Sequence, residues 1–116
     1  MFPKRGEIYL VALDPVQGSE EGKTRPAVII QNDLGNQFSQ TTVVVPVTSR
    51  LPERRYPHEI FINGAECGLN KDGTILLAQI RCLDKSRILR KIGTIPLSKM
   101  KEVDQGLKKN LALEQS

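Results

Sequence analysis

Hydrophobic residues in this chain gather in short runs rich in Val, Ile and Thr, a composition that favours strands over helices. The runs predict five strands, at residues 7–13, 26–31, 41–48, 58–62 and 74–80. A last small strand is predicted around residues 91–95, after one short turn that begins at Asp84. Pro46 cannot donate a hydrogen bond to a neighbouring strand, so we expect it to mark a sheet edge or a bulge.

Helical periodicity occurs only near the C-terminus. Met100, Val103, Leu107 and Leu111 recur at spacings of three and four residues, which places them on one stripe of an α-helix. Ser98 is the expected N-cap of this helix. The connections between the predicted strands carry no amphipathic segment long enough to join parallel strands. The pattern therefore predicts a mainly β (α+β) fold, a small antiparallel barrel with a C-terminal helix.

Composition narrows the classes of protein to consider. The 116 residues fit a single domain over residues 1–116, and a net charge of +4 makes nucleic acid a candidate partner. The apolar runs are too short to cross a bilayer and no secretory signal is readable, so we expect a cytoplasmic protein with no membrane partner. One histidine, His58, and two scattered cysteines, Cys67 and Cys82, argue against a zinc site and against hydrolase triads.

Residues 18–24, Gly-Ser-Glu-Glu-Gly-Lys-Thr, resemble a nucleotide-binding P-loop only superficially. The spacing is one residue short, a strand follows instead of a helix, and two glutamates stand where phosphate would bind. The loop delivers Arg25 to the start of a strand, and Pro26 keeps Arg25 extended. A guanidinium with a rigid root can donate two parallel hydrogen bonds to a phosphate, although an ion pair with Glu20 or Glu21 is the alternative.

Two further groups of polar residues stand at strand ends. Thr48 and Ser49 close the Val-rich strand with hydroxyl groups, which matter for chemistry only if the fold brings Thr48 next to Arg25. Gln79 and Arg81 are two residues apart and are expected to form a polar stripe that can meet base edges.

Several sequence blocks occur in a characteristic order. They are Lys4-Arg5-Gly6-Glu7-Ile8-Tyr9, Gly18-Ser19-Glu20, Lys23-Thr24-Arg25-Pro26-Ala27-Val28-Ile29, Gln31-Asn32-Asp33, Pro46-Val47-Thr48, Gln79-Ile80-Arg81 and Leu83-Asp84-Lys85-Ser86-Arg87. In this order the blocks resemble the MazF/PemK toxins of bacterial toxin–antitoxin pairs, over most of the chain. The resemblance implies an SH3-like barrel of twisted antiparallel strands with short helices, which works as a homodimer.

The resemblance also implies an activity. It is that of a sequence-specific, metal-independent endoribonuclease that cuts single-stranded RNA, mainly mRNA, to arrest growth. The 2′-hydroxyl attacks the adjacent phosphorus and leaves a 2′,3′-cyclic phosphate and a 5′-hydroxyl. Arg25 and Thr48 match the catalytic pair, and no cofactor is implied. The general base stays open between Glu20 and Arg25, because a guanidinium with a pKa of about 12 or above is a poor proton acceptor.

Recognition of RNA is expected to depend on hydrogen bonds. Aromatic residues are only 4% of the chain, too few for extensive base stacking, which favours a sequence-selective enzyme. The expected RNA-binding residues are Ser19, Glu20, Lys23, Pro26, Asn32, Ser49, Gln79 and Arg81. Residues 50–57, with three arginines, are the predicted lid.

Partners follow from the same reasoning. A basic groove for RNA is also suited to the acidic, flexible segment of a cognate antitoxin. Apolar residues in 43–47 and 100–111 exceed the apparent need of one small sheet, which supports a homodimer. Two alternatives remain. A gyrase-poisoning toxin like CcdB would need a C-terminal tryptophan, which this chain lacks, and a non-catalytic RNA-binding barrel would leave Arg25 and Thr48 without roles.

Overall fold

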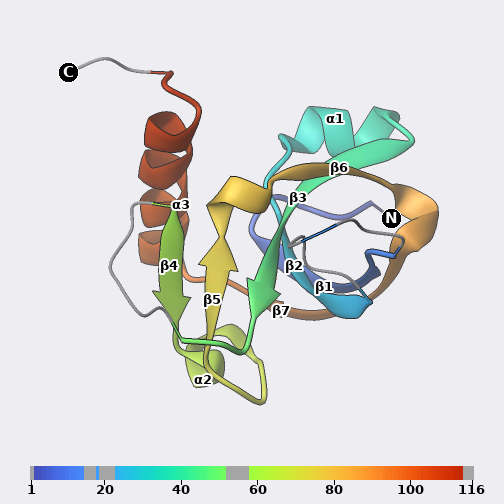
Figure 1. Ribbon diagram of the computed structural model, residues 1–116. Coiled ribbons are helices and arrows are strands. Elements are labelled where there is room, and N and C mark those ends of the chain that lie inside the picture. The colour runs from blue at the N-terminus through green and yellow to red at the C-terminus, as the bar shows by residue number, and fades with distance from the viewer. Residues whose placement is uncertain (1, 15–17, 19–22, 52–57, 114–116) are drawn as a thin grey trace.

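The computed structural model describes residues 2–14, 18, 23–51 and 58–113 (Figure 1). Over these residues the strands are β1 (Glu7–Ala12), β2 (Thr24–Ile29), β3 (Thr41–Thr48), β4 (Glu59–Ile62), β5 (Gly73–Leu76), β6 (Arg81–Asp84) and β7 (Ile88–Thr94). The α-helices are α1 (Asp33–Phe38), α2 (Gly64–Cys67) and α3 (Leu97–Asn110), and 3-10 turns occupy Leu77–Gln79 and Lys85–Arg87.

The strands form one antiparallel sheet with the order β4-β5-β3-β2-β1-β7, and β6 also pairs with β3. In Figure 1 the strands β6, β3, β2, β1 and β7 curl around one another, while β4 and β5 extend the sheet towards α3. The mainly β (α+β) barrel with a C-terminal helix, predicted from the sequence, is therefore confirmed.

One hydrophobic cluster packs against each face of the sheet. Val44 belongs to a smaller cluster enclosed by the curled strands, whereas its neighbour Val45 belongs to a larger cluster that α3 covers. In β1, Val11 belongs to the smaller cluster and Ile8 to the larger one. Because both faces of β3 are buried, most of its sequence is a continuous apolar run without polar alternation.

The predicted strands agree with the structure except at several ends. The run 74–80 is strand only as far as Leu76, where a 3-10 turn begins. Pro46 is not at a sheet edge, because it pairs with Ala27 of β2. It lies where β3 changes partner, since the pairs with β6 end at Val44 and those with β5 begin at Val47. On that side of β3 a missing N–H therefore interrupts no ladder.

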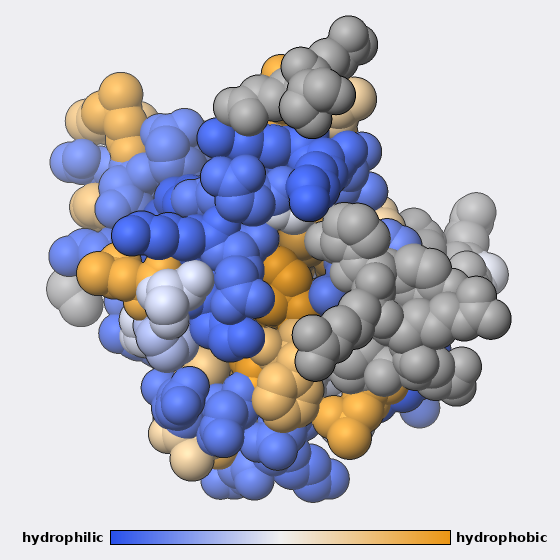
Figure 2. Space-filling model, turned by 90° about the vertical axis from the view of Figure 1, so that its left-hand side faces the viewer, coloured by the Kyte–Doolittle hydropathy of each residue, from blue (hydrophilic) through white to orange (hydrophobic). Residues whose placement is uncertain are grey.

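Helix α3 carries three of the four predicted stripe residues, Met100, Val103 and Leu107, as buried side chains. The fourth, Leu111, is the C-cap and is exposed. It begins at Leu97 after Pro96, so the predicted N-cap at Ser98 is wrong. Figure 2 shows the face that carries α3 and β4, on which hydrophilic side chains predominate. None of the helices in the described part of the chain is long and apolar enough to cross a membrane.

Most of the apolar residues that supported a homodimer are buried within a single copy of the chain. The side chains of Val44, Val45, Val47, Met100, Val103 and Leu107 are all buried within one copy of the chain. Both faces of β3 need apolar residues, because each of its faces meets a separate cluster. The argument from residues 43–47 therefore fails, whereas Leu111, at the end of the range 100–111, is 45% exposed and still offers an apolar side chain for a second copy to cover.

Candidate active site

Arg25 and Thr48 lie at neighbouring ends of β2 and β3. The two strands pair antiparallel, and the last pair of the ladder is Ala27 opposite Pro46. The ladder ends there, but the same register continued by two residues would set Arg25 opposite Thr48, and both residues line one groove. Directly opposed residues on antiparallel strands are side-chain neighbours. The fold thus meets the condition under which the Thr48 hydroxyl can act together with the Arg25 guanidinium.

Both residues line an open groove with a volume of about 670 Å³. Its walls are the ends of β2 and β3, the middle of β1, the loop between α2 and β5, and part of β7. The charged residues among its described lining are Arg25, Lys71, Asp72, Arg90 and Lys91. Positive charge is therefore in excess, which suits a polyanionic ligand.

The hydroxyl of Thr48 is held in a defined position. Its Oγ1 accepts a hydrogen bond from the Arg50 amide at 3.3 Å, and only 6% of the residue is exposed. Thr74, the partner of Thr48 on β5, donates its hydroxyl to the Arg50 carbonyl at 2.8 Å. Gly73 lets the strands approach, since a Cβ there would lie 2.7 Å from the Thr48 carbonyl oxygen. The chain after β3 is thus held by hydrogen bonds to both the backbone amide and the backbone carbonyl of Arg50.

A cluster of polar side chains joins β1 to β7 beside the groove. The Lys91 ammonium lies 2.8 Å from Glu7 Oε2, and the Tyr9 hydroxyl donates to Glu7 Oε1 at 3.1 Å. Burial acts to raise the pKa of Glu7, but the bonds from Lys91, the Lys4 amide and Tyr9 together hold that pKa below its usual value. Burial, and then the Glu7 carboxylate, raise the pKa of Tyr9 to about 12. Lys91 is therefore engaged within the protein.

This cluster gives a titration that can be measured. In a Tyr56→Phe variant, Tyr9 is the one remaining tyrosine, and we expect its ultraviolet phenolate signal to appear with a midpoint near pH 12. Because the folded pKa exceeds the unfolded value of about 10, stability is lost as pH rises through this interval. Adding Glu7→Gln should lower the midpoint. A midpoint near 10 while circular dichroism still shows folded protein would contradict the cluster.

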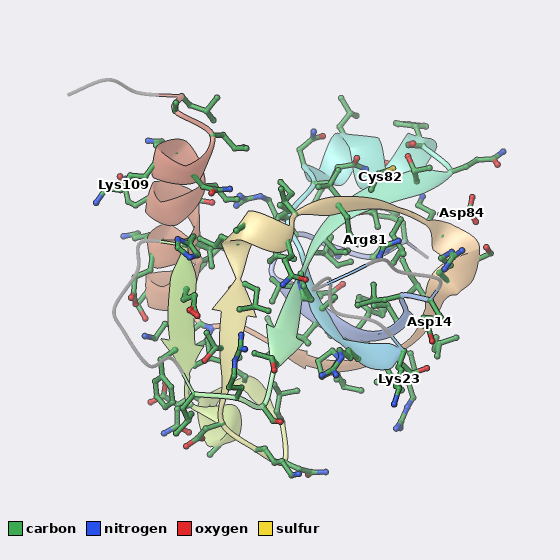
Figure 3. The ribbon with its side chains drawn as sticks, viewed as in Figure 1. Asp14, Lys23, Arg81, Cys82, Asp84 and Lys109 are labelled. Carbon is green, nitrogen blue, oxygen red and sulfur yellow. The ribbon has the colours of Figure 1, made fainter. Side chains whose placement is uncertain are left out.

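Some of the predicted RNA-binding residues share the groove with the Arg25–Thr48 pair. Pro26 and Ser49 line it directly. Lys23 is exposed just before β2, in the left-handed conformation with φ 61°, and its amide donates to Asp14 Oδ1 at 2.7 Å. Figure 3 shows these two residues together below the barrel. Ser19 and Glu20, and residues 52–57 of the predicted lid, lie outside the described residues.

The remaining predicted RNA contacts do not line this groove. Asn32 caps α1, with its Oδ1 accepting from the Gly35 amide at 2.8 Å. Arg81, labelled on β6 in Figure 3, donates from Nη1 to the Leu13 carbonyl at 3.2 Å. Gln79 is half-buried at the end of a 3-10 turn. Asn32 and Arg81 thus have structural contacts, and an RNA contact for any of the three stays a prediction.

Sequence reasoning missed three residues of this site. Thr74 positions the segment after Thr48, while Lys71 and Arg90 add positive charge to the groove wall. None lies in a motif. Arg90 could have been found only from the strand register, because Leu10 of β1 pairs with Pro26 on one side and with Arg90 on the other.

Fold and groove together define a small barrel protein whose cationic groove is suited to phosphate groups. Its fold is similar to that of MazF (Form-I) from Deinococcus radiodurans, with a TM-score of 0.81, 27% identity, and 97% of this chain and 98% of that chain covered. The MazE–MazF (Form-II) structure from the same organism matches with a TM-score of 0.79, 28% identity, and coverage of 98% and 99%.

A mycobacterial endoribonuclease in complex with its cognate antitoxin has a TM-score of 0.81 with this chain, 22% identity, and coverage of 98% and 99%, a likeness of fold alone. Residues 4–111 match the model of the PemK-like, MazF-like toxins of type II toxin–antitoxin systems. The chain belongs to this family, which confirms the resemblance seen in its sequence blocks.

Proposed function

We propose that this protein is an endoribonuclease that cleaves single-stranded RNA, mainly mRNA, at selected sequences and so acts as a growth-arresting toxin. The observation that carries the proposal is that Arg25 and Thr48 line one groove whose charged residues are mainly positive. Membership of the MazF-like toxins supports it, as does the likeness to proteins described as MazF and as endoribonucleases.

In the proposed mechanism the nucleophile belongs to the substrate. The ribose 2′-hydroxyl attacks the adjacent phosphorus, the P–O5′ bond breaks, and the products carry a 2′,3′-cyclic phosphate and a 5′-hydroxyl. The Arg25 guanidinium donates to the charged oxygens of the pentacoordinate phosphorus, and Thr48 adds a neutral donor. One such donor, fixed in advance, is typically worth about 3–4 kcal/mol in the transition state.

The role of Thr48 depends on its hydroxyl orientation. Because Oγ1 accepts from the Arg50 amide, the hydroxyl proton points elsewhere, and within the described part of the chain the hydroxyl donates no hydrogen bond. That proton can therefore be donated to a phosphate oxygen. The proton of the 2′-hydroxyl passes to a general base, which is Glu20 or, only if it is in its neutral guanidine form, Arg25. The same base then returns a proton to the 5′-oxygen as the P–O5′ bond breaks.

We further propose two protein partners. The MazF of Deinococcus radiodurans was solved with MazE, and the mycobacterial endoribonuclease with its cognate antitoxin. An antitoxin with an acidic flexible segment is the corresponding partner here, because such a segment can occupy a cationic groove. A homodimer is the second proposal. A groove of about 790 Å³ beside α3 leaves Leu111 and Leu113 exposed in one copy, where a second copy can cover them.

Purified protein incubated with a long labelled mRNA in the presence of EDTA tests this function. We expect cleavage at a limited set of sites, fragments ending in 2′,3′-cyclic phosphate, and no cleavage where the nucleotide 5′ to the cut is 2′-deoxy. Light scattering of the same preparation should give the mass of a dimer. Intact RNA together with stalled gyrase would favour the gyrase poison instead, and intact bound RNA would favour a non-catalytic barrel.

A further inference from the structure

We propose that Lys71 and Arg90 form a second phosphate site, which holds the RNA backbone on the groove wall formed by the α2–β5 loop and β7. The inference rests on the proposed function and extends it from the reacting phosphate to a flanking one. Both residues line the groove that Arg25 and Thr48 also line. The site binds the substrate and takes no part in the chemistry.

The two cations are available for a ligand. Lys71 and Arg90 are both exposed, and in the part of the chain that the structure describes neither side chain makes a hydrogen bond or an ion pair. Lys91, also in the groove wall, is instead held 2.8 Å from Glu7 Oε2. The neighbouring carboxylate of Asp72 is engaged as well, since its Oδ1 accepts from the Gly64 amide at 2.9 Å.

The site stands at a short distance from the reacting centre. Leu10 of β1 pairs with Pro26 of β2 on one side and with Arg90 of β7 on the other. With neighbouring strands about 4.8 Å apart, the backbone of Arg90 lies about 10 Å from that of Pro26, the residue next to Arg25. A short stretch of single-stranded RNA can therefore place one phosphate at Arg25 and a flanking phosphate at Arg90.

The roots of both side chains are rigid, so the site exists before RNA binds. Lys71 packs so closely on α2 that a Cβ at Gly64 would lie 2.2 Å from the Lys71 carbonyl oxygen. The end of α2 packs in turn on β7, where a Cβ at Gly93 would lie 2.0 Å from the Cys67 carbonyl oxygen. This contact fixes the loop that carries Lys71 against the strand that carries Arg90. Binding then costs little backbone ordering.

The test measures binding of a probe that the proposed chemistry cannot cut. A fluorescently labelled single-stranded oligonucleotide with 2′-deoxy sugars is titrated, by anisotropy, with wild type and with the double variant Lys71→Ala/Arg90→Ala at several salt concentrations. Each phosphate contact on a single strand contributes about −0.7 to the slope of log affinity against log salt. We expect the double variant to have a slope shallower by about 0.7–1.4 and an affinity at low salt roughly 10-fold weaker.

Lys109→Ala is the matched control, because it removes one exposed positive charge from α3, outside this groove (Figure 3). It should keep the wild-type slope. Arg90→Lys combined with Lys71→Arg should also keep it, because the charges remain. In RNA cleavage the double variant should lose roughly 10-fold in kcat/KM while kcat stays within about twofold, since the lost contact binds ground state and transition state alike.

The outcomes separate this inference from the proposed function. A double variant that is folded, by circular dichroism, and binds the probe with the slope and affinity of Lys109→Ala overturns the second phosphate site. A double variant whose cleavage defect is a reduced kcat, with KM unchanged, also overturns it. If wild type binds the probe but leaves unmodified RNA intact, the proposed function fails, and the change of slope still decides whether the Lys71–Arg90 site exists.

Discussion

Arg25→Ala is expected to reduce RNA cleavage by at least about 10²-fold, with a much smaller effect on RNA affinity. The guanidinium meets negative charge that develops only as the phosphorus becomes pentacoordinate, so its removal falls on kcat. The residue is half-buried at the start of β2, and we expect the free energy of unfolding to change by about 1 kcal/mol or less. Single-turnover cleavage and binding of the 2′-deoxy oligonucleotide measure the two effects separately.

Two companion variants sharpen this test. Arg25→Lys should restore little activity, because an ammonium lacks the planar fork that donates two parallel bonds to a phosphate. Thr48→Val keeps the size of a residue that is only 6% exposed and removes the hydroxyl, so it should cost less than the loss of Arg25. Activity near that of wild type in Arg25→Ala, or cleavage of the 2′-deoxy site, would place the chemistry elsewhere in the chain.

The parts of the fold that the sequence predicts are those with a strong apolar period. Strand β3 is readable because its β-branched run is buried on both faces. Helix α3 is readable because three of its buried residues share one stripe. Helix α1 has no such period, since its one buried residue is Asn36, which is held by hydrogen bonds. A helix of six residues held by polar contacts leaves no hydrophobic pattern to detect.

In the candidate site too, the sequence predicts the features that have a local pattern and misses those that depend on contacts between distant segments. The sequence indicates that Arg25 and Thr48 stand at strand ends, but not which strands pair, so their juxtaposition needs the β2–β3 register. For Arg81, alternation along the chain predicts a polar stripe, whereas its guanidinium donates to the carbonyl of Leu13, a residue remote in sequence. Lys71 comes to the groove through the packing of the α2–β5 loop. Contacts between distant segments leave no local pattern.

That packing makes Gly93 the position where one added methyl group should have the largest effect on stability. A Cβ at residue 93 would lie 2.0 Å from the Cys67 carbonyl oxygen, and this contact is with backbone, which cannot rotate away. Overpacking of this kind costs about 1–3 kcal/mol, and we expect the upper end for Gly93→Ala. For a domain of this size that corresponds to a fall of roughly 10 °C in Tm.

Gly35→Ala is the control for this change. Its added Cβ would meet the Gln31 side chain at 3.0 Å, whose Nε2 donates to Asn36 Oδ1 and to the Thr41 carbonyl. Ala is about 1 kcal/mol better than Gly within a helix, so we expect a smaller net loss than for Gly93→Ala. Gly93→Ala should also weaken binding of the 2′-deoxy oligonucleotide. The clash between the new Cβ and the Cys67 carbonyl can be relieved only if α2 moves away from β7, and this movement displaces Lys71 as well. Thermal unfolding and the salt-dependent titration measure the two effects. A Gly93→Ala protein with wild-type Tm would show that α2 does not pack on β7 as described, and would remove the support on which the position of Lys71 depends.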